Sequence, residues 1–317
     1  MQDKVKSAVK TIAEIIESLE PLTNKKLIEI CRANGIELIG SQNEAHLIHE
    51  LLETGVNLSI VKSFSQANLL EKTRESQTLD CLSKLLENCP PQSWRGEEQL
   101  RLQQFSTPPT IAYLMAKILK PLPAELVLEP SAGTGSLAAW LKVAGCRIHV
   151  NELSEMRRVL LELQGYTPTG FDAEFLDDLL PEKIEPDAVL MNPPFSSSGG
   201  RTKTNDSNFG FGHVRSALLR LKTGGRLVAL MGTESATKTE KGRKFWREIA
   251  AEYDLRAIIH LPKNAFYKYG TSIGTTLVCV AKNQPTESAN RSGNRKNVLE
   301  TSCETLHECL KYADIFN

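Results

Sequence analysis

The sequence predicts an α/β fold in which helices cover both faces of a mostly parallel sheet, preceded by a small all-helical N-terminal domain. Two observations carry this prediction. From about residue 100, short apolar runs alternate with amphipathic helical stretches, and repeated strand–helix units of this kind form parallel sheets. Over residues 1–90, apolar side chains recur at helical spacing and no strand-like run interrupts them.

The N-terminal region divides into four predicted helices. Pro21 ends the first helix, and Thr23 has a side chain suited to cap the second. The third helix starts near Asn43, and we expect Gly55 to end it. Residues 69–89 form the fourth helix.

Seven strands are predicted in the α/β part. Six are clear apolar runs, and the third, at 169–178, is weak. No helix pattern separates the last two strands, so we expect them to be antiparallel. The clear runs are 125–130, 147–153, 187–192, 226–232, 255–261 and 275–282.

Composition shifts divide the chain into four predicted parts. Residues 1–90 form a helical accessory domain, and 91–98 form a linker that begins at the second of two consecutive prolines, Pro90 and Pro91. The α/β domain covers residues 99–282. Residues 283–317 form a polar linker followed by a short C-terminal helix.

The overall composition is that of an ordinary globular protein. The 317 residues include 38 basic and 38 acidic side chains, so the net charge does not suggest a non-specific polyanion binder. The chain has no apolar run near the ~20 residues of a membrane span and no signal-peptide pattern at its start. Its seven cysteines show no paired short spacings, which predicts reduced thiols and a cytoplasmic location.

Two groups of potential metal ligands lead to no metal prediction. His46, His49 and Glu50 share part of one helical face, which we interpret as a solvated or partner-facing surface. The Cys-His cluster at 303–309 offers too few ligands for a tetrahedral zinc site.

The first strand ends in a glycine-rich turn, LEPSAGTGSL. Gly133 and Gly135, next to Ala132, allow a tight turn and a close approach of the backbone to a ligand. The turn lacks the Gly-Lys-Ser/Thr ending of a phosphate loop. Glu129 beside it would repel a pyrophosphate and favours a cationic ligand.

Acidic residues follow the next two predicted strands. Glu152 lies close to the ~20-residue spacing at which an acid binds a ribose diol in nucleoside-binding α/β folds. Asp172 is our candidate acceptor for an adenine amino group. Together with Glu129, these residues predict a positively charged nucleoside, and S-adenosylmethionine fits that description.

The fourth predicted strand ends in MNPPF. The amide oxygen of Asn192 and the carbonyl of Pro193 can accept both hydrogens of one amino group, and Pro194 stiffens the corner. Phe195 can stack on a planar ring and hold it for transfer, which is catalysis by positioning. The competing interpretation is a Pro-Pro strand terminator with Phe195 packed on the core.

Four segments in this order, FSTPPTIA (105–112), LEPSAGTG (128–135), NEL (151–153) and MNPPF (191–195), resemble the DNA adenine-N6 methyltransferases. They are most similar to the modification subunits of type I restriction-modification systems and to stand-alone adenine methylases. The resemblance covers residues 99–282. It implies a seven-stranded Rossmann-like methyltransferase sheet, S-adenosylmethionine as cofactor and adenine in double-stranded DNA as substrate.

The resemblance also implies further site residues. A segment that closes over the methionine part of the cofactor corresponds to Phe105, Ser106, Thr107 and Pro108, and Phe266 would be a second wall for the flipped base. Flipping costs a few kcal/mol, because adenine N6 is otherwise hidden in the duplex.

In the polar loop 196–212, Arg201 and Lys203 are candidate contacts to DNA phosphates; an ordinary surface loop is the alternative.

Two other functions stay open. The same clamp would suit guanine N2 of ribosomal RNA or a glutamine amide of a protein. A non-catalytic subunit that binds DNA or a partner is the second alternative. The family usually has a target-recognition region or a separate specificity subunit, and we expect too few residues after Lys282 for such a region. Specificity would then come from a protein partner or the N-terminal helices, or be low.

Overall fold

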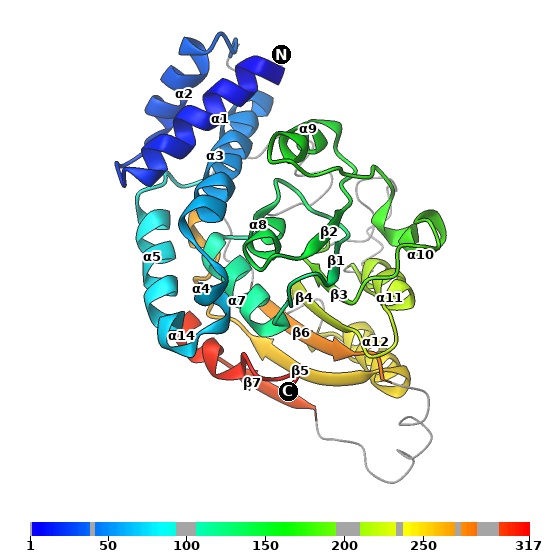
Figure 1. The fold of residues 1–317 in the computed structure, drawn as a ribbon. Coiled ribbons are helices and arrows are strands. Elements are labelled where there is room, and N and C mark those ends of the chain that lie inside the picture. The colour runs from blue at the N-terminus through cyan, green and yellow to red at the C-terminus, as the bar shows by residue number, and fades with distance from the viewer. Residues whose placement is uncertain are drawn as a thin grey trace.

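A computed structural model shows how the chain is arranged (Figure 1). The description covers residues 2–38, 42–92, 106–194, 210–232, 237–269, 274–283 and 298–317.

Seven strands form one mixed sheet at the centre of the fold, in the order β2-β1-β3-β4-β6-β5-β7 (Figure 1). The pairs β1–β2, β1–β3 and β3–β4 are parallel, whereas β6 is antiparallel to both β4 and β5, which confirms the expected antiparallel finish. The strands are β1 (Leu126–Glu129), β2 (Arg147–Val150), β3 (Ala188–Met191), β4 (Arg226–Gly232), β5 (Asp254–His260), β6 (Thr275–Ala281) and β7 (Leu299–Ser302).

The inner strands β1, β3, β4 and β6, together with β5, bury residues on both of their faces, because successive side chains point to opposite sides of a sheet. Val127 and Leu190 belong to the larger hydrophobic core, whereas their chain neighbours Leu128 and Met191 belong to the second. A sheet buried on two sides needs helices on two sides, as the sequence predicts.

The helices form two layers. The larger core includes side chains from α1 (Gln2–Glu17), α2 (Asn24–Ala33), α3 (Gln42–Ser63), α4 (Gln66–Leu70), α5 (Glu75–Glu87), α7 (Pro109–Leu119), α8 (Ser136–Val143) and α14 (Leu306–Cys309). The second core includes side chains from α10 (Leu176–Leu179), α11 (Phe211–Arg220) and α12 (Glu240–Glu252). Helix α9 (Glu155–Leu163) follows β2. The side chain of Thr23 accepts a hydrogen bond from the Lys26 N–H, which confirms the predicted cap of α2.

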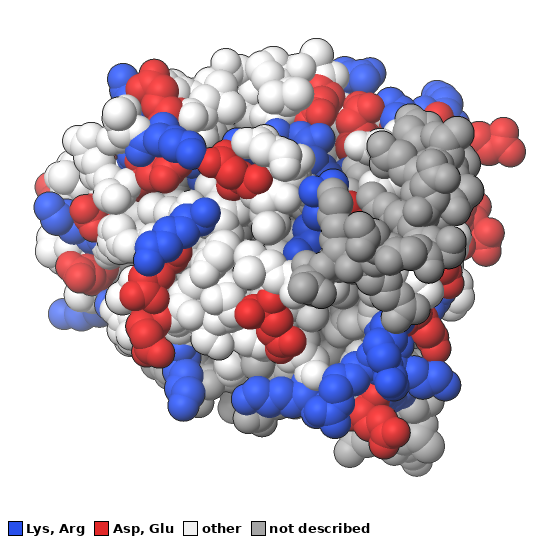
Figure 2. Space-filling view, turned by 90° about the horizontal axis from the view of Figure 1, so that it is seen from below, with Lys and Arg blue, Asp and Glu red and all other residues white. Residues whose placement is uncertain are grey.

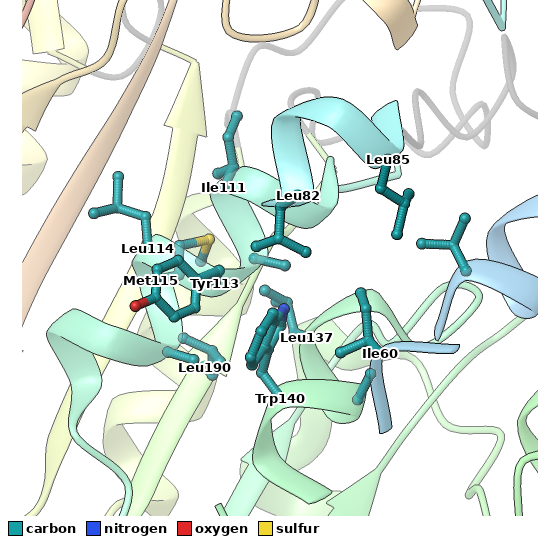
Figure 3. Packing of buried hydrophobic residues seen from close by; sticks show 14 of the residues in the cluster. Ile60, Leu82, Leu85, Ile111, Tyr113, Leu114, Met115, Leu137, Trp140 and Leu190 are labelled. Carbon is teal, nitrogen blue, oxygen red and sulfur yellow. The ribbon is translucent and has the colours of Figure 1, made fainter. Parts of the chain in front are cut away.

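Helix α7 joins the N-terminal helices to the sheet. Every one of its residues is buried. Its Tyr113 packs against Trp140 of α8 with the ring centroids 4.9 Å apart, close to Ile60 of α3 and Leu82 of α5 (Figure 3). The N-terminal helices therefore share one continuous core with the sheet.

The third predicted strand is not formed. At 169–178 the chain makes one parallel bridge, Asn151 to Thr169, and then the short helices η2 (Ala173–Phe175) and α10. The seventh strand is instead β7, which pairs in parallel with β5 where the sequence predicted a linker and a helix. Three of its four residues are exposed, so it lacks the apolar alternation by which strands are recognised.

Gly55 does not end the third helix, which continues to Ser63. A Cβ atom on Gly55 would lie 2.6 Å from Cγ2 of Ile12 in α1 and 3.3 Å from the backbone nitrogen of Ala13. The glycine therefore serves the close approach of two helices. Within the described residues, no helix is long and apolar enough to cross a membrane.

We expect Gly55→Ala to lower the free energy of unfolding by up to about 2 kcal/mol, because overpacking costs about 1–3 kcal/mol and alanine gains only ~1 kcal/mol in a helix. Urea unfolding measures the change. In an Ile12→Ala background the contact with Cγ2 is gone, while the Cβ of residue 12 at 3.2 Å and the Ala13 nitrogen at 3.3 Å stay, so Gly55→Ala should cost clearly less there than in the wild type. An equal loss in both backgrounds would show that the Ile12 contact is not the cause.

Candidate active site

A cleft of about 470 Å³ opens at the carboxyl ends of β1, β2 and β3. Strand β1 has β2 on one side and β3 on the other, so the strand order reverses there, and this is where open α/β sheets bind ligands. The described lining residues come from four segments: Ser106, Thr107, Glu129, Ser131, Ala132, Gly133, Thr134, Ser136, Glu152, Arg157, Asn192, Pro193 and Pro194.

The glycine-rich turn forms one wall. Gly133 and Gly135 have φ values of +57° and +94°, which side-chain-bearing residues rarely adopt. A Cβ on Gly133 would meet no atom within 4 Å, so the turn exposes bare backbone to the cleft. The Gly133 N–H donates to Oε2 of Glu152 at 2.7 Å, and the Ser154 N–H donates to Oε1 at 2.9 Å. Glu152 thus holds the turn from the end of β2.

Glu129 lies at the end of β1 and is only 1% exposed. Burial raises the pKa of its carboxyl well above the usual range; a backbone hydrogen bond from Ala138 opposes this shift, and the charge of Glu152 adds to it. Its Oε2 atom accepts no hydrogen bond from any described residue. A buried acceptor without a partner is costly unless a ligand supplies the donor. This observation fits a cationic group.

The Asn-Pro-Pro corner forms the opposite wall. The Asn192 side-chain nitrogen donates to Oγ1 of Thr107 at 3.0 Å, which turns the amide so that its oxygen faces away from Thr107. Thr107 and Pro108 immediately precede α7, and Pro108 occupies its N-cap position. The two predicted motifs, FSTPP and NPPF, therefore meet at the cleft.

The sequence analysis missed a contribution from α3. Glu53 is 3% exposed, and its Oε2 accepts from Oγ of Ser106 and from Oγ1 of Thr134, each at 2.8 Å. The side-chain nitrogen of Asn57 donates to the Thr134 carbonyl at 2.8 Å. These residues lie far from the motifs in sequence, and no local pattern distinguishes them from ordinary polar positions on an N-terminal helix.

Arg157 of α9 brings a positive charge to the cleft. Its Nε donates to Oε1 of Glu50 at 2.6 Å, and His46 lies 3.1 Å from the same oxygen. Burial alone would raise the pKa of Glu50, but Arg157 and His46 outweigh it and bring that pKa to about 2. The expected solvated face at His46, His49 and Glu50 is therefore wrong, because all three side chains are buried and Glu50 pairs within the chain.

Two predicted site residues lie elsewhere. Asp172 begins η2, where its Oδ1 accepts from the Glu174 N–H at 3.2 Å. Phe266 is 1% exposed and belongs to the larger core, which leaves its ring no open face for a substrate base in this conformation. Neither is among the described residues that line the cleft. The predicted residues Phe105, Phe195, Arg201 and Lys203 lie outside the described part of the chain.

A cationic adenosine suits this arrangement. Two carboxylates, Glu129 and Glu152, line the cleft with Arg157, and Glu53 lies directly behind the turn. S-adenosylmethionine carries a sulfonium, an ammonium and a carboxylate. Its two positive charges and one negative charge are complementary to the two carboxylates and the one guanidinium that line the cleft. If it binds, Glu129 and Arg157 are the groups to meet its charged end, and the backbone at Gly133 is open to its body.

Comparison with known proteins bears on the family and on the fold. Residues 151–300 match the family model described as N-6 DNA Methylase, which confirms the resemblance predicted from the sequence.

Three solved structures share the fold. A Vibrio vulnificus protein assigned as the modification subunit of a type I restriction enzyme is 17% identical, with a TM-score of 0.50. The match covers 82% of this chain and 54% of the other, so this chain spans about half the length of that subunit. A type I restriction-modification methyltransferase subunit from Streptococcus thermophilus is 16% identical, with a TM-score of 0.50, and the match covers 100% of this chain and 94% of that one.

The third is a Listeria monocytogenes protein assigned as a class I S-adenosylmethionine-dependent methyltransferase. It is 17% identical with a TM-score of 0.53, and the match covers 100% of this chain and 99% of that one. At these identities the likeness shows the fold, and it confirms the predicted Rossmann-like methyltransferase architecture.

We expect Glu129→Gln to stabilise the protein without ligand at neutral pH while weakening its binding of S-adenosylmethionine. A carboxyl whose pKa is higher in the folded than in the unfolded state lowers the free energy of unfolding once the pH rises above its pKa in the unfolded state. The gain should be about 1 kcal/mol, roughly 1–3 °C in Tm, at pH 7 and should vanish near pH 4.

Calorimetric titration should show Kd for S-adenosylmethionine about tenfold higher in the Glu129→Gln variant, because the charge that meets the ammonium is gone. Glu14→Gln, on the exposed side of α1, is the matched control. Unchanged affinity would contradict the assignment of Glu129 to the cationic group.

Proposed function

We propose that this chain, whose residues 151–300 have the sequence pattern of the N-6 DNA methylases, transfers a methyl group from S-adenosylmethionine to the N6 amino group of adenine in DNA. One observation carries the proposal. The Asn192–Thr107 hydrogen bond joins the Asn-Pro-Pro corner, the proposed amine clamp, to a cleft in which one oxygen of the buried Glu129 carboxyl, Oε2, accepts no hydrogen bond from the described residues and suits a cationic donor.

The proposed role of the corner follows from the chemistry of an exocyclic amine, whose lone pair is delocalised into the ring. The Asn192 oxygen and the Pro193 carbonyl would each accept one amino hydrogen, which localises the lone pair on nitrogen. Phe195 would stack on the base. S-adenosylmethionine supplies an electrophilic methyl bound to a sulfonium.

In the proposed reaction the amino nitrogen would attack the methyl carbon in line, and the carbon–sulfur bond would break with its electrons passing to sulfur. The nitrogen then loses a proton to solvent. No strong base is needed before the attack, so positioning supplies most of the catalysis.

Helix α12 favours a nucleic acid over a protein as the substrate. The start of α11 lies between this helix and the clamp: a Cβ on Gly210 would lie 2.8 Å from the Pro194 oxygen, and Phe211 stacks on Phe245 of α12 at 4.2 Å between ring centroids. Exposed basic residues occur close together there: Lys238, Lys241, Arg243, Lys244 and Arg247. Arg215 of α11 forms ion pairs with Glu248 and Glu252 of α12, and these pairs neutralise two acidic side chains of α12.

Seen from below, Lys and Arg side chains gather at the lower right of the molecule, with Asp and Glu side chains among them (Figure 2). Cations beside a base clamp are suited to bind backbone phosphates, which position a duplex without reading its sequence.

We further propose that sequence specificity comes from a partner subunit. The similar Streptococcus chain is described as a subunit of a type I system. The N-terminal helices of this chain are committed to its own core and cleft, which supports a separate source of recognition.

Methyl transfer from labelled S-adenosylmethionine tests the proposed reaction. Unmethylated DNA should acquire N6-methyladenine, and Asn192→Ala should lower the rate at least about 100-fold, because a positioning contact to the reacting group is lost. Asn317→Ala, at the exposed C-terminus, is the matched control. Label found only in RNA or protein would overturn the DNA proposal, and undiminished transfer by Asn192→Ala would overturn the clamp.

The triple variant Arg243→Gln, Lys244→Gln, Arg247→Gln should bind DNA with a weaker salt dependence. Each lost phosphate contact lowers the slope of log K against log salt by about 0.9, so we expect a decrease of roughly 1–3 in fluorescence-anisotropy titrations. Binding of S-adenosylmethionine should not change.

The control for this experiment carries the same loss of charge on the distant helix α2: Lys25→Gln, Lys26→Gln, Arg32→Gln. Equal slopes for the two triple variants would show that α12 does not contact phosphate.

A further inference from the structure

We infer that Glu53 of α3 is a positioning residue for the cofactor: it holds the hydroxyls of Ser106 and Thr134 as hydrogen-bond acceptors toward the methionine end of S-adenosylmethionine. The inference rests on the proposed function and adds to it a residue outside all the motifs. It makes the N-terminal helices a part of the cofactor site.

The geometry places one carboxylate oxygen between two cofactor segments. Oε2 of Glu53 accepts from Ser106 Oγ and from Thr134 Oγ1, both at 2.8 Å. Ser106 belongs to the segment before α7, and Thr134 belongs to the glycine-rich turn; both line the cleft. Glu53 therefore links two walls that are otherwise separate in the chain.

A hydroxyl has one proton, and an ionised carboxylate can only accept. Because the Ser106 and Thr134 hydroxyls each use their one hydrogen in the hydrogen bond to Glu53, their oxygens can only accept hydrogen bonds from other partners. A ligand ammonium, which has three N–H donors, is a suitable partner for such oxygens, whereas a ligand carboxylate is not. Glu53 thus sets the hydrogen-bond polarity of this part of the cleft.

The charged residues of the cleft indicate which end of the cofactor lies here. Adenosine is neutral, whereas the methionine end carries an ammonium and a carboxylate. Glu129, with its unpartnered Oε2, lines the same cleft as the two hydroxyls, and so does Arg157. The methionine end is therefore the part of the ligand that these groups can recognise.

The Thr134 backbone is held as well as its hydroxyl. Side-chain nitrogens of Asn57 and Gln164 each donate to its carbonyl at 2.8 Å. Asn57 lies one helical turn after Glu53 on α3, so the same helix binds Thr134 at two atoms. Such pre-organisation lowers the ordering cost of binding.

The cost of a buried carboxylate at this position also argues for a function. Burial raises the pKa of Glu53, against the opposing effects of its hydrogen bonds to Thr134 and Ser106 and of the charge of Arg157. An apolar side chain of similar size would fill the space without this desolvation penalty. The hydrogen bonds to two cleft hydroxyls are what an apolar residue could not supply.

Two variants and two ligands test the inference. Glu53→Met removes the acceptor and keeps the volume, whereas Glu53→Gln keeps an amide oxygen that can accept both hydroxyls. The ligands are S-adenosylmethionine and 5′-methylthioadenosine, which lacks the amino-acid end. Calorimetry on the full chain measures both affinities, and methyl transfer measures KM and kcat.

For Glu53→Met we expect Kd for S-adenosylmethionine to rise about 10- to 100-fold, while Kd for 5′-methylthioadenosine changes less than about threefold. KM for S-adenosylmethionine should rise with it, and kcat at saturation should stay near that of the wild type. Glu53→Gln should restore most of the affinity. If Glu53 had only a structural role, Glu53→Met would weaken the binding of both ligands to a similar extent.

Glu14→Met on α1 is the matched control, and thermal unfolding checks that each variant is folded. If Glu53→Met does not fold, Ser106→Ala removes one of the two hydroxyls and should show the same selective loss on a smaller scale. Equal loss for both ligands, or no loss, overturns the inference. A wild type that binds no S-adenosylmethionine overturns the proposed function instead, so the two failures are distinguishable.

Discussion

The parallel pairing of β1 with β2 and β3 is the constraint on which the rest of the structure depends. In the register of these ladders, Glu129 pairs with Val150 and Leu128 pairs with Val189. The residues that follow each strand therefore emerge at one edge of the sheet. Glu129, Glu152 and Asn192 meet there although the chain separates them, and the cleft is a consequence of the hydrogen-bond pattern of the backbone.

The helical region at the N-terminus completes the cleft from behind. Helix α3 approaches α1 closely at Gly55, packs on α8, which follows β1, and presents Glu53 and Asn57 to the glycine-rich turn. The turn is therefore held from two sides, by Glu152 at the end of β2 and by α3. The part of the chain without methyltransferase motifs thus determines the geometry of the part that has them.

Polar groups are concentrated where the fold is least able to solvate them. Glu50, Glu53, Glu129 and Glu152 are all at least 95% buried, and among the described lining residues Arg157 supplies the positive charge. Interiors accept such groups when hydrogen bonds or ion pairs compensate them, as Glu50, Glu53 and Glu152 are compensated. Oε2 of Glu129 is the exception, and exceptions of this kind are typical of binding sites.

The sequence alone was sufficient wherever the determining forces are local. The strand–helix alternation, the cap at Thr23 and the positive-φ glycines of the turn follow from short-range backbone and side-chain chemistry. The strand ends at Glu129, Glu152 and Asn192 were also predictable, because parallel topology follows from repeated strand–helix units. Thr107 came from the family resemblance, and the structure places it against Asn192.

Only the tertiary structure decided the features that depend on distant neighbours. Gly55 resembles a helix terminator until Ile12 is seen against it, and residues 169–178 resemble a weak strand until the chain turns into η2. An exposed four-residue edge such as β7 is recognisable only once β5 pairs with it. The contacts of Glu53 and Asn57 with the glycine-rich turn were likewise not predictable from the sequence. The local sequence pattern indicates which residues prefer burial, whereas the packing of distant segments determines what they contact.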